Sequence, residues 1–157
     1  SHLYVPHPPF LFGENGENIT PNHRDISGLQ SWENPDGYVN QLIYATTEIS
    51  DVVESIIEND PSAIILVQGD TGTLTGIDHN SEKTFNDVYQ SRSILYAIRI
   101  PGNVDLQEIN PVNTYRIIFN HIFNSNYDYL ETSNFEINDN GELIDITQKL
   151  KSYNFKP

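Results

Sequence analysis

The apolar run at residues 63–67, AIILV, most constrains how this chain of 157 residues can fold. It is short and rich in β-branched side chains, and Pro61 precedes it while the loop QGDTG follows it. A pattern of this kind is typical of a strand that is buried on both faces, as in parallel sheets. Residues 38–59 carry apolar side chains at helical spacing and end at Asp60-Pro61. A helix placed directly before a buried strand predicts an α/β domain.

The rest of the chain supplies further helix and strand patterns. A short helix is predicted at residues 81–90, and a second apolar strand at 93–100 is closed by Pro101-Gly102. Asn110-Pro111 opens a predicted helix of about four turns, since proline suits the first turn of a helix. The C-terminal residues predict a weak hairpin that turns at 138–141, followed by a helix near 144–151.

Composition excludes several classes of function. The chain has 22 acidic and 8 basic residues, so its net charge is −14. A surface this acidic repels nucleic-acid backbones, although the same acidity also simply favours solubility. There is no cysteine, which excludes disulfides and thiolate metal sites. No run approaches the roughly 20 apolar residues of a membrane span, so we expect no membrane contact by this segment.

Two loops carry residue types suited to binding an anion or a cation. In open α/β sheets, ligands bind outside the carboxyl ends of the strands. Asp70 follows the apolar run and stands between Gly69 and Gly72, where a carboxylate could reach a hard divalent cation. His7 stands between prolines, where its imidazole could donate to an anionic oxygen or bind a metal. The alternatives are ordinary, because aspartate is a common turn residue and a lone histidine is commonly only a surface residue.

The order of the segments adds a resemblance to a known family. The segments HLYVPHPPFLFG, SAIILVQGDTG, SILYAIRIPG and NPVNTYRIIFNHIFN follow one another as in one group of sulfatase-like proteins of the alkaline phosphatase superfamily. The most specific parts lie at residues 2–10 and 110–123. The resemblance implies an α/β fold in three layers, with a mostly parallel sheet and helices on both faces. Residues 1–135 would be the C-terminal part of that domain, and residues 136–157 would be an extension of it.

The resemblance also implies a chemistry. Members of the superfamily hydrolyse or transfer sulfate and phosphate esters with a Thr, Ser or formylglycine nucleophile beside one or two divalent metals, such as Mn, Zn, Mg or Ca. Asp70 matches a metal ligand of these proteins. His7 matches the histidine that contacts the anionic group of the substrate or the metal, which makes it the candidate catalytic residue. His2 matches a recurring histidine and is, with His7, a candidate substrate-binding residue.

The sequence departs from the family pattern at the metal site. Thr71 stands where the family has a histidine ligand, and a threonine hydroxyl is a poorer ligand for zinc or manganese than imidazole. His79, farther along the loop, could replace the lost imidazole. The nucleophile of the family lies upstream of the residues matched here. The chain begins at Ser1 and contains no Met, so we expect it to be part of a longer protein.

We therefore expect a segment of a metal-dependent sulfuric or phosphoric ester hydrolase or transferase, related to phosphoglycerol and phosphoethanolamine transferases. In isolation it would be inactive and could lack a metal. Its partners would be the upstream part of its own chain and an anionic ester, on the extracytoplasmic side of a membrane. One alternative is a catalytically degenerate binding or scaffolding domain. Another is a folding unit completed by the rest of its own chain, which an apolar exposed face would reveal.

Overall fold

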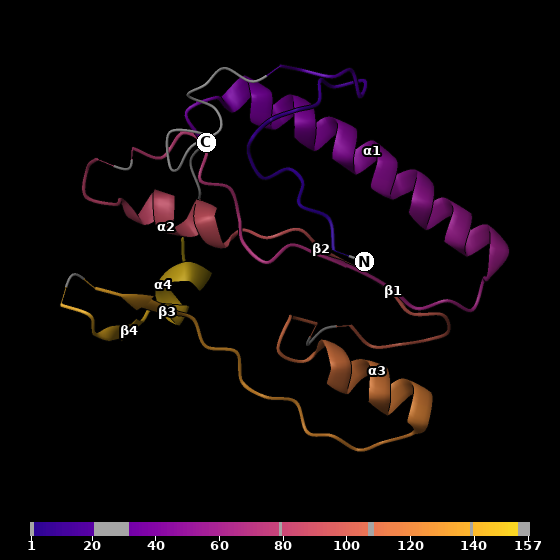
Figure 1. Ribbon diagram of the computed structural model, residues 1–157. Coiled ribbons are helices and arrows are strands. Elements are labelled where there is room, and N and C mark those ends of the chain that lie inside the picture. Colours follow the sequence, from indigo (N-terminus) through magenta and orange to yellow (C-terminus); the bar gives the residue numbers. More distant parts are fainter. Residues whose placement is uncertain (1, 21–31, 79, 107–108, 139, 154–157) are drawn as a thin grey trace. The chain divides into compact units, whose positions relative to one another are not determined.

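The computed structural model describes residues 2–20, 32–78, 80–106, 109–138 and 140–153. The chain divides into two compact units, Ser1–Ile98 and Arg99–Pro157. In chain order the elements (Figure 1) are α1 (Pro35–Asn59), β1 (Ile65–Gln68), α2 (Phe85–Arg92), β2 (Tyr96–Arg99), α3 (Thr114–Phe123), β3 (Phe135–Ile137), β4 (Leu143–Asp145) and α4 (Thr147–Lys151).

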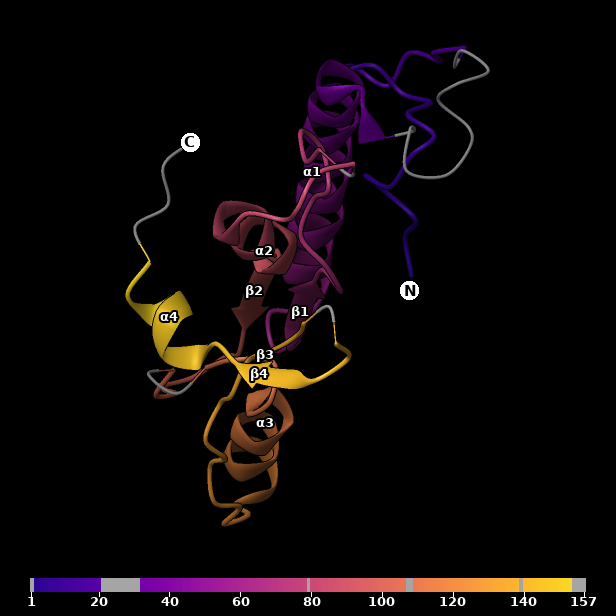
Figure 2. The ribbon, with the colours of Figure 1, turned by 90° about the vertical axis from the view of Figure 1, so that its left-hand side faces the viewer.

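Helix α1, Pro35–Asn59, is the longest element and runs for 25 residues. It begins at an Asn34 cap whose side chain accepts a hydrogen bond of 2.9 Å from the Gly37 N–H, with proline at the first helical position. At its end the Asp60 N–H donates to Ile56 O, and Pro61 prevents continuation. The predicted helix is confirmed and starts three residues earlier than its apolar pattern. The segment before it lies alongside its N-terminal half in both ribbon views (Figures 1 and 2).

Strands β1, Ile65–Gln68, and β2, Tyr96–Arg99, form a sheet of two strands. The Gly69 N–H donates to Leu95 O at 2.8 Å. Because Gly69 follows the end of β1 while Leu95 precedes the start of β2, the two strands run antiparallel. The second pair of strands is also antiparallel. The predicted fold of three layers with a mostly parallel sheet and helices on both faces is therefore wrong for the described residues.

The physical reason for the error lies in what an apolar run can specify. Such a run indicates that a strand avoids water, but it fixes neither the direction nor the number of neighbouring strands. The apolar side chains of β1 are half-buried rather than enclosed on both faces. The strand itself was predicted correctly, and its sheet was not.

Helix α2, Phe85–Arg92, connects the two strands of the first unit. It begins at a capping box, in which the Thr84 side chain accepts from the Asp87 N–H and the Asp87 carboxylate accepts from the Thr84 N–H at 2.8 Å. The Gln90 side chain donates to Thr75 O at 2.7 Å and ties the helix to the loop after β1. The predicted short helix is confirmed, shifted toward the C-terminus.

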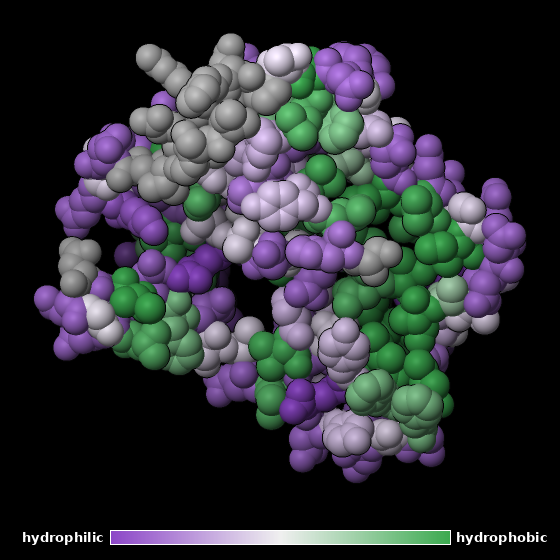
Figure 3. All heavy atoms as spheres, viewed as in Figure 1, coloured by the Kyte–Doolittle hydropathy of each residue, from purple (hydrophilic) through white to green (hydrophobic). Residues whose placement is uncertain are grey.

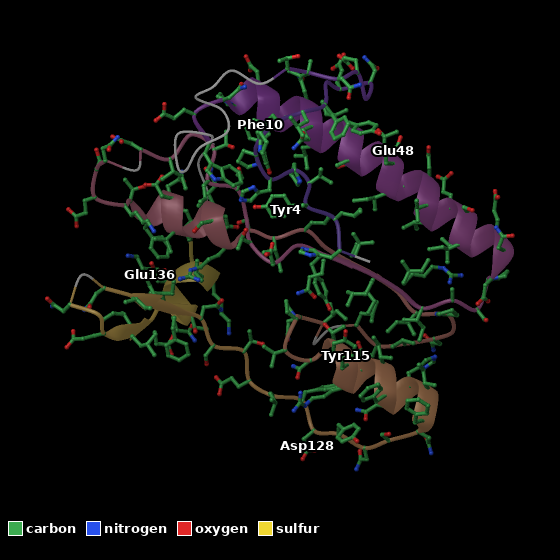
Figure 4. The ribbon with its side chains drawn as sticks, viewed as in Figure 1. Tyr4, Phe10, Glu48, Tyr115, Asp128 and Glu136 are labelled. Carbon is green, nitrogen blue, oxygen red and sulfur yellow. The ribbon has the colours of Figure 1, made fainter. Side chains whose placement is uncertain are left out.

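In the second unit, helix α3, Thr114–Phe123, has apolar side chains on both of its faces. One face is buried and contains Ile117 and Ile118. The opposite face is exposed and aromatic: Tyr115 is 62% exposed and Phe123 is 68% exposed. Phe119 lies between them, with ring centroids 6.1 and 5.8 Å from those of its two neighbours. Figure 4 labels Tyr115 on this helix, and hydrophobic surface is visible over the same region in Figure 3.

The C-terminal elements are a hairpin and a short helix. Strands β3, Phe135–Ile137, and β4, Leu143–Asp145, pair with Glu136 opposite Ile144, which confirms the predicted hairpin. Helix α4, Thr147–Lys151, follows directly. The Thr147 hydroxyl accepts from the Asn134 N–H at 2.7 Å and joins the start of α4 to the start of β3.

The Asp145 carboxylate predicts a local pH dependence. Hydrogen bonds from the Thr147 side chain, and then from its backbone N–H, lower the pKa of Asp145 below the ordinary 3.8 and outweigh its slight desolvation. Folding therefore favours the ionised form. Its contribution to stability is present above pH 3.8 and is lost as the pH falls through the lower folded pKa. The Thr147 amide resonance should titrate below pH 3.8 and should stop doing so in Asp145→Asn.

Candidate functional site

The imidazole of His7 is held in one orientation by its own loop. Nδ1 lies 2.6 Å from Pro8 O, and because a carbonyl oxygen only accepts, Nδ1 carries the hydrogen. Nε2 then has the free lone pair, and the Tyr4 hydroxyl lies 3.3 Å from it as the donor. A histidine that donates from one nitrogen to a backbone carbonyl presents the other nitrogen for chemistry. His7 is exposed, so Nε2 can meet a ligand from solution.

Aromatic rings surround this imidazole. The Tyr4 ring lies 4.4 Å from it between centroids, and the Trp32 ring meets it edge-on at 5.2 Å. The Trp32 ring also contacts those of Phe10 and Tyr38, with 6.3 Å between ring centroids in each pair. Figure 4 labels Tyr4 and Phe10 on the segment before α1. The exposed imidazole of His7 therefore lies beside the exposed Tyr4 ring and against Trp32, which links it to Phe10 and Tyr38.

The loop that carries His7 is tied to α1 by one buried side chain. The Gln41 amide donates from Nε2 to His7 O at 3.1 Å, and its Oε1 accepts from the N–H groups of Leu11 and Phe12 at 2.7 and 3.3 Å. Gln41 is 1% exposed. Sequence analysis overlooked this residue. Its only signal was an amide that occupies the helical spacing of the apolar Tyr38 and Ala45.

The loop after β1 presents Asp70 and Thr71 between two anchors. On one side the Gly69 N–H is bonded to Leu95 O, and on the other the Gly72 N–H donates to Ser91 O at 2.7 Å. Both residues between the anchors are exposed. The two glycines of the motif therefore fix the loop by backbone hydrogen bonds and leave the Asp70 carboxylate facing solvent.

The described residues do not assemble a metal site. Among them, no group of three or more His, Asp or Glu side chains could hold a metal ion. Asp70 brings one carboxylate and Thr71 one hydroxyl, fewer ligands than a divalent cation requires. His79 lies outside the described residues. The described side chains therefore do not fit a metal on their own.

The structure places the predicted site residues on two segments, the N-terminal segment and the loop after β1. His2 is exposed on the N-terminal segment, and within the described parts of the chain no hydrogen bond joins His2 or His7 to Asp70. Each half of the predicted site therefore lies on its own segment.

Across the residues that the structure describes, no helix is both long and apolar enough to cross a membrane.

Comparison with known proteins adds no relative. The sequence matches no protein-family model, no curated protein and no solved structure.

Proposed function

We propose that this chain is part of a metal-dependent sulfuric or phosphoric ester hydrolase or transferase. In the intact protein, His7 contacts the anionic group of the ester, His2 is a second substrate-binding residue, and Asp70 is a ligand of a divalent metal. The observation that supports this best is the hydrogen bond from Nδ1 of His7 to Pro8 O, which makes Nε2, beside the Tyr4 hydroxyl on an exposed ring, the nitrogen available to a ligand. The order of the four sequence motifs along the chain supports the same proposal.

His7 can bind an anion through a change in the protonation of Nε2 alone. In the neutral ring, Nε2 accepts from the Tyr4 hydroxyl. When Nε2 takes up a proton, both ring nitrogens donate. Nδ1 then keeps its bond to Pro8 O, and Nε2 donates a charge-assisted hydrogen bond to a sulfate or phosphate oxygen. The Tyr4 hydroxyl has to turn away or accept from Nε2 when this happens.

The exposed aromatic face of α3 supports a further part of the proposal. A helix that is apolar on both faces is typical of the interior of a larger protein. In α3 the buried Ile117 and the exposed Phe119 lie on opposite faces. We propose that the upstream part of the same protein completes this core and supplies the nucleophile, on the extracytoplasmic side of a membrane. The chain by itself should therefore hydrolyse neither aryl sulfate nor aryl phosphate esters.

The test titrates inorganic phosphate into the folded chain and follows its imidazole resonances by NMR. We expect a saturable change at His7 and none at His121, whose Nε2 is hydrogen-bonded to Pro101 O at 2.9 Å. His7→Gln should remove the response while the chain stays folded, because His7 is exposed. Equal responses at the two histidines, or none at His7, would contradict the proposal, as would hydrolysis of either ester by the isolated chain.

Thr71 favours a second candidate, a binding or scaffolding domain that has lost catalysis. Its hydroxyl stands where an imidazole ligand is expected and is exposed. Calorimetric titration of manganese or zinc into the intact protein separates the two. Heat that disappears in Asp70→Ala supports the metal-dependent enzyme, and the absence of heat in both proteins supports the binding domain.

A further inference from the structure

We infer that Gln41 is a positioning residue for His7: its buried amide holds the proline-rich loop in the conformation that presents Nε2. The chemical role of Nε2 in this inference rests on the proposed function. The positioning itself stands on the geometry of the loop.

The proline-rich part of the loop has few backbone donors of its own, although the residues after it form a bridge between Phe12 and Asn18. Pro6, Pro8 and Pro9 have no N–H group and cannot donate to a ladder. The carbonyl of His7 and the N–H groups that follow the prolines therefore need partners from elsewhere, since buried backbone groups are almost always paired. One side chain from a helix 30 residues farther along supplies them.

Gln41 binds the loop on both sides of Pro8-Pro9. Its own Nε2 donates to the His7 carbonyl before these prolines, and its Oε1 accepts from two backbone N–H groups after them. An amide offers two donors and two acceptor lone pairs, so three of its four hydrogen-bonding positions are used. The bond to the His7 carbonyl acts on the same residue whose side chain bonds to the next carbonyl, at Pro8. The orientation of the ring is thereby linked to the anchor.

Packing alone does not account for an amide at this position. Burying an amide is unfavourable unless it is hydrogen-bonded, and leucine would fill a similar volume without that cost. Gln41 lies between helical neighbours that suit a core, including the buried Ala45. The amide is therefore explained by the loop that it binds.

The test compares two variants by the 15N chemical shifts of His7, which report which ring nitrogen carries the hydrogen. The wild-type chain should show hydrogen on Nδ1. Gln41→Leu should lose that preference. It should also weaken the affinity for phosphate, read from the His7 resonance, about fivefold, which corresponds to the loss of one hydrogen bond. Ala45→Gly, a matched change on the same helix, should lower stability yet leave the His7 tautomer unchanged.

A second variant covers the case in which Gln41→Leu does not fold. Gln41→Glu keeps an acceptor for Leu11 and Phe12 but removes the donor to the His7 carbonyl, so the tautomer preference should again be lost. An unchanged tautomer in a folded Gln41 variant would overturn the inference, as would an equal change in Ala45→Gly. If the tautomer depends on Gln41 but phosphate leaves His7 unaffected, the positioning holds and the proposed function fails.

Discussion

Replacing Asn113 with alanine is expected to lower the free energy of unfolding of the second unit by about 2–4 kcal/mol. Asn113 is fully buried at 0% exposure. Its Nδ2 donates to Leu130 O, and its Oδ1 accepts from the Leu130 N–H, both at 2.9 Å. Alanine removes both hydrogen bonds and leaves a backbone donor and acceptor without partners, which costs more than the bonds themselves contribute.

The pair of hydrogen bonds between one asparagine side chain and one backbone residue, here called a clamp, occurs a second time along α3. Asn120 makes the same pair of bonds with Tyr127, at 2.9 and 2.8 Å. The two asparagines are seven residues apart on the helix side, about 10 Å at 1.5 Å per residue. Tyr127 and Leu130 are three residues apart in an extended segment, again about 10 Å at 3.3 Å per residue. The returning segment is therefore held in register along α3 at two points.

Hydrogen exchange of the Leu130 amide and urea unfolding of the α3 amides measure this effect. Asn120→Ala is the matched control, and because that clamp is exposed to water we expect a loss of only about 0.5–1 kcal/mol. Asn113→Asp keeps the acceptor and loses the donor, so its loss of stability should lie between those of Asn120→Ala and Asn113→Ala. If Asn113→Ala and Asn120→Ala lose the same stability, the buried clamp has no special role.

Local patterns were sufficient to predict most of the elements. Periodicity located the helix ending at Asn59, and turn residues located the hairpin at Gly141, because both signals lie within a few residues of what they specify. The sheet could not be predicted this way. The direction of β1 depends on a partner strand some 30 residues away, and parallel and antiparallel pairing share the same apolar run.

The candidate site shows the same division. His7 and Asp70 stood out by residue type and by position in their loops. Gln41, which holds the His7 loop, did not stand out, because it acts on backbone groups 30 residues away, and Asn113 in the second unit likewise acts on a segment 17 residues away. An amide on an otherwise apolar helix face was the available signal. It indicates a buried polar side chain that requires partners, but it does not say which backbone groups these are.

Gly72→Ala is expected to lower stability by about 3 kcal/mol, whereas Gly69→Ala in the same loop should change it by less than about 0.5 kcal/mol. A Cβ at position 72 would overlap the carbonyl oxygen of Gln90 and lie 2.9 Å from the carbonyl carbon of Ser91. These are backbone atoms of α2, which cannot rotate away as a side chain could. A Cβ at position 69 would meet its nearest atoms at 3.5 and 3.6 Å, an ordinary contact.

The comparison of the two glycines tests what the QGDTG motif does. If Gly72 serves to dock the loop on the end of α2, Gly72→Ala should also break the bond from its N–H to Ser91 O and shift the Asp70 and Thr71 resonances. Gly69→Ala should leave those resonances nearly unchanged, because its own bond to Leu95 O needs no close approach. Thermal unfolding and amide spectra of the two variants measure both effects. Equal losses of stability would mean that the motif's glycines serve chain flexibility, since the steric argument applies to only one of them.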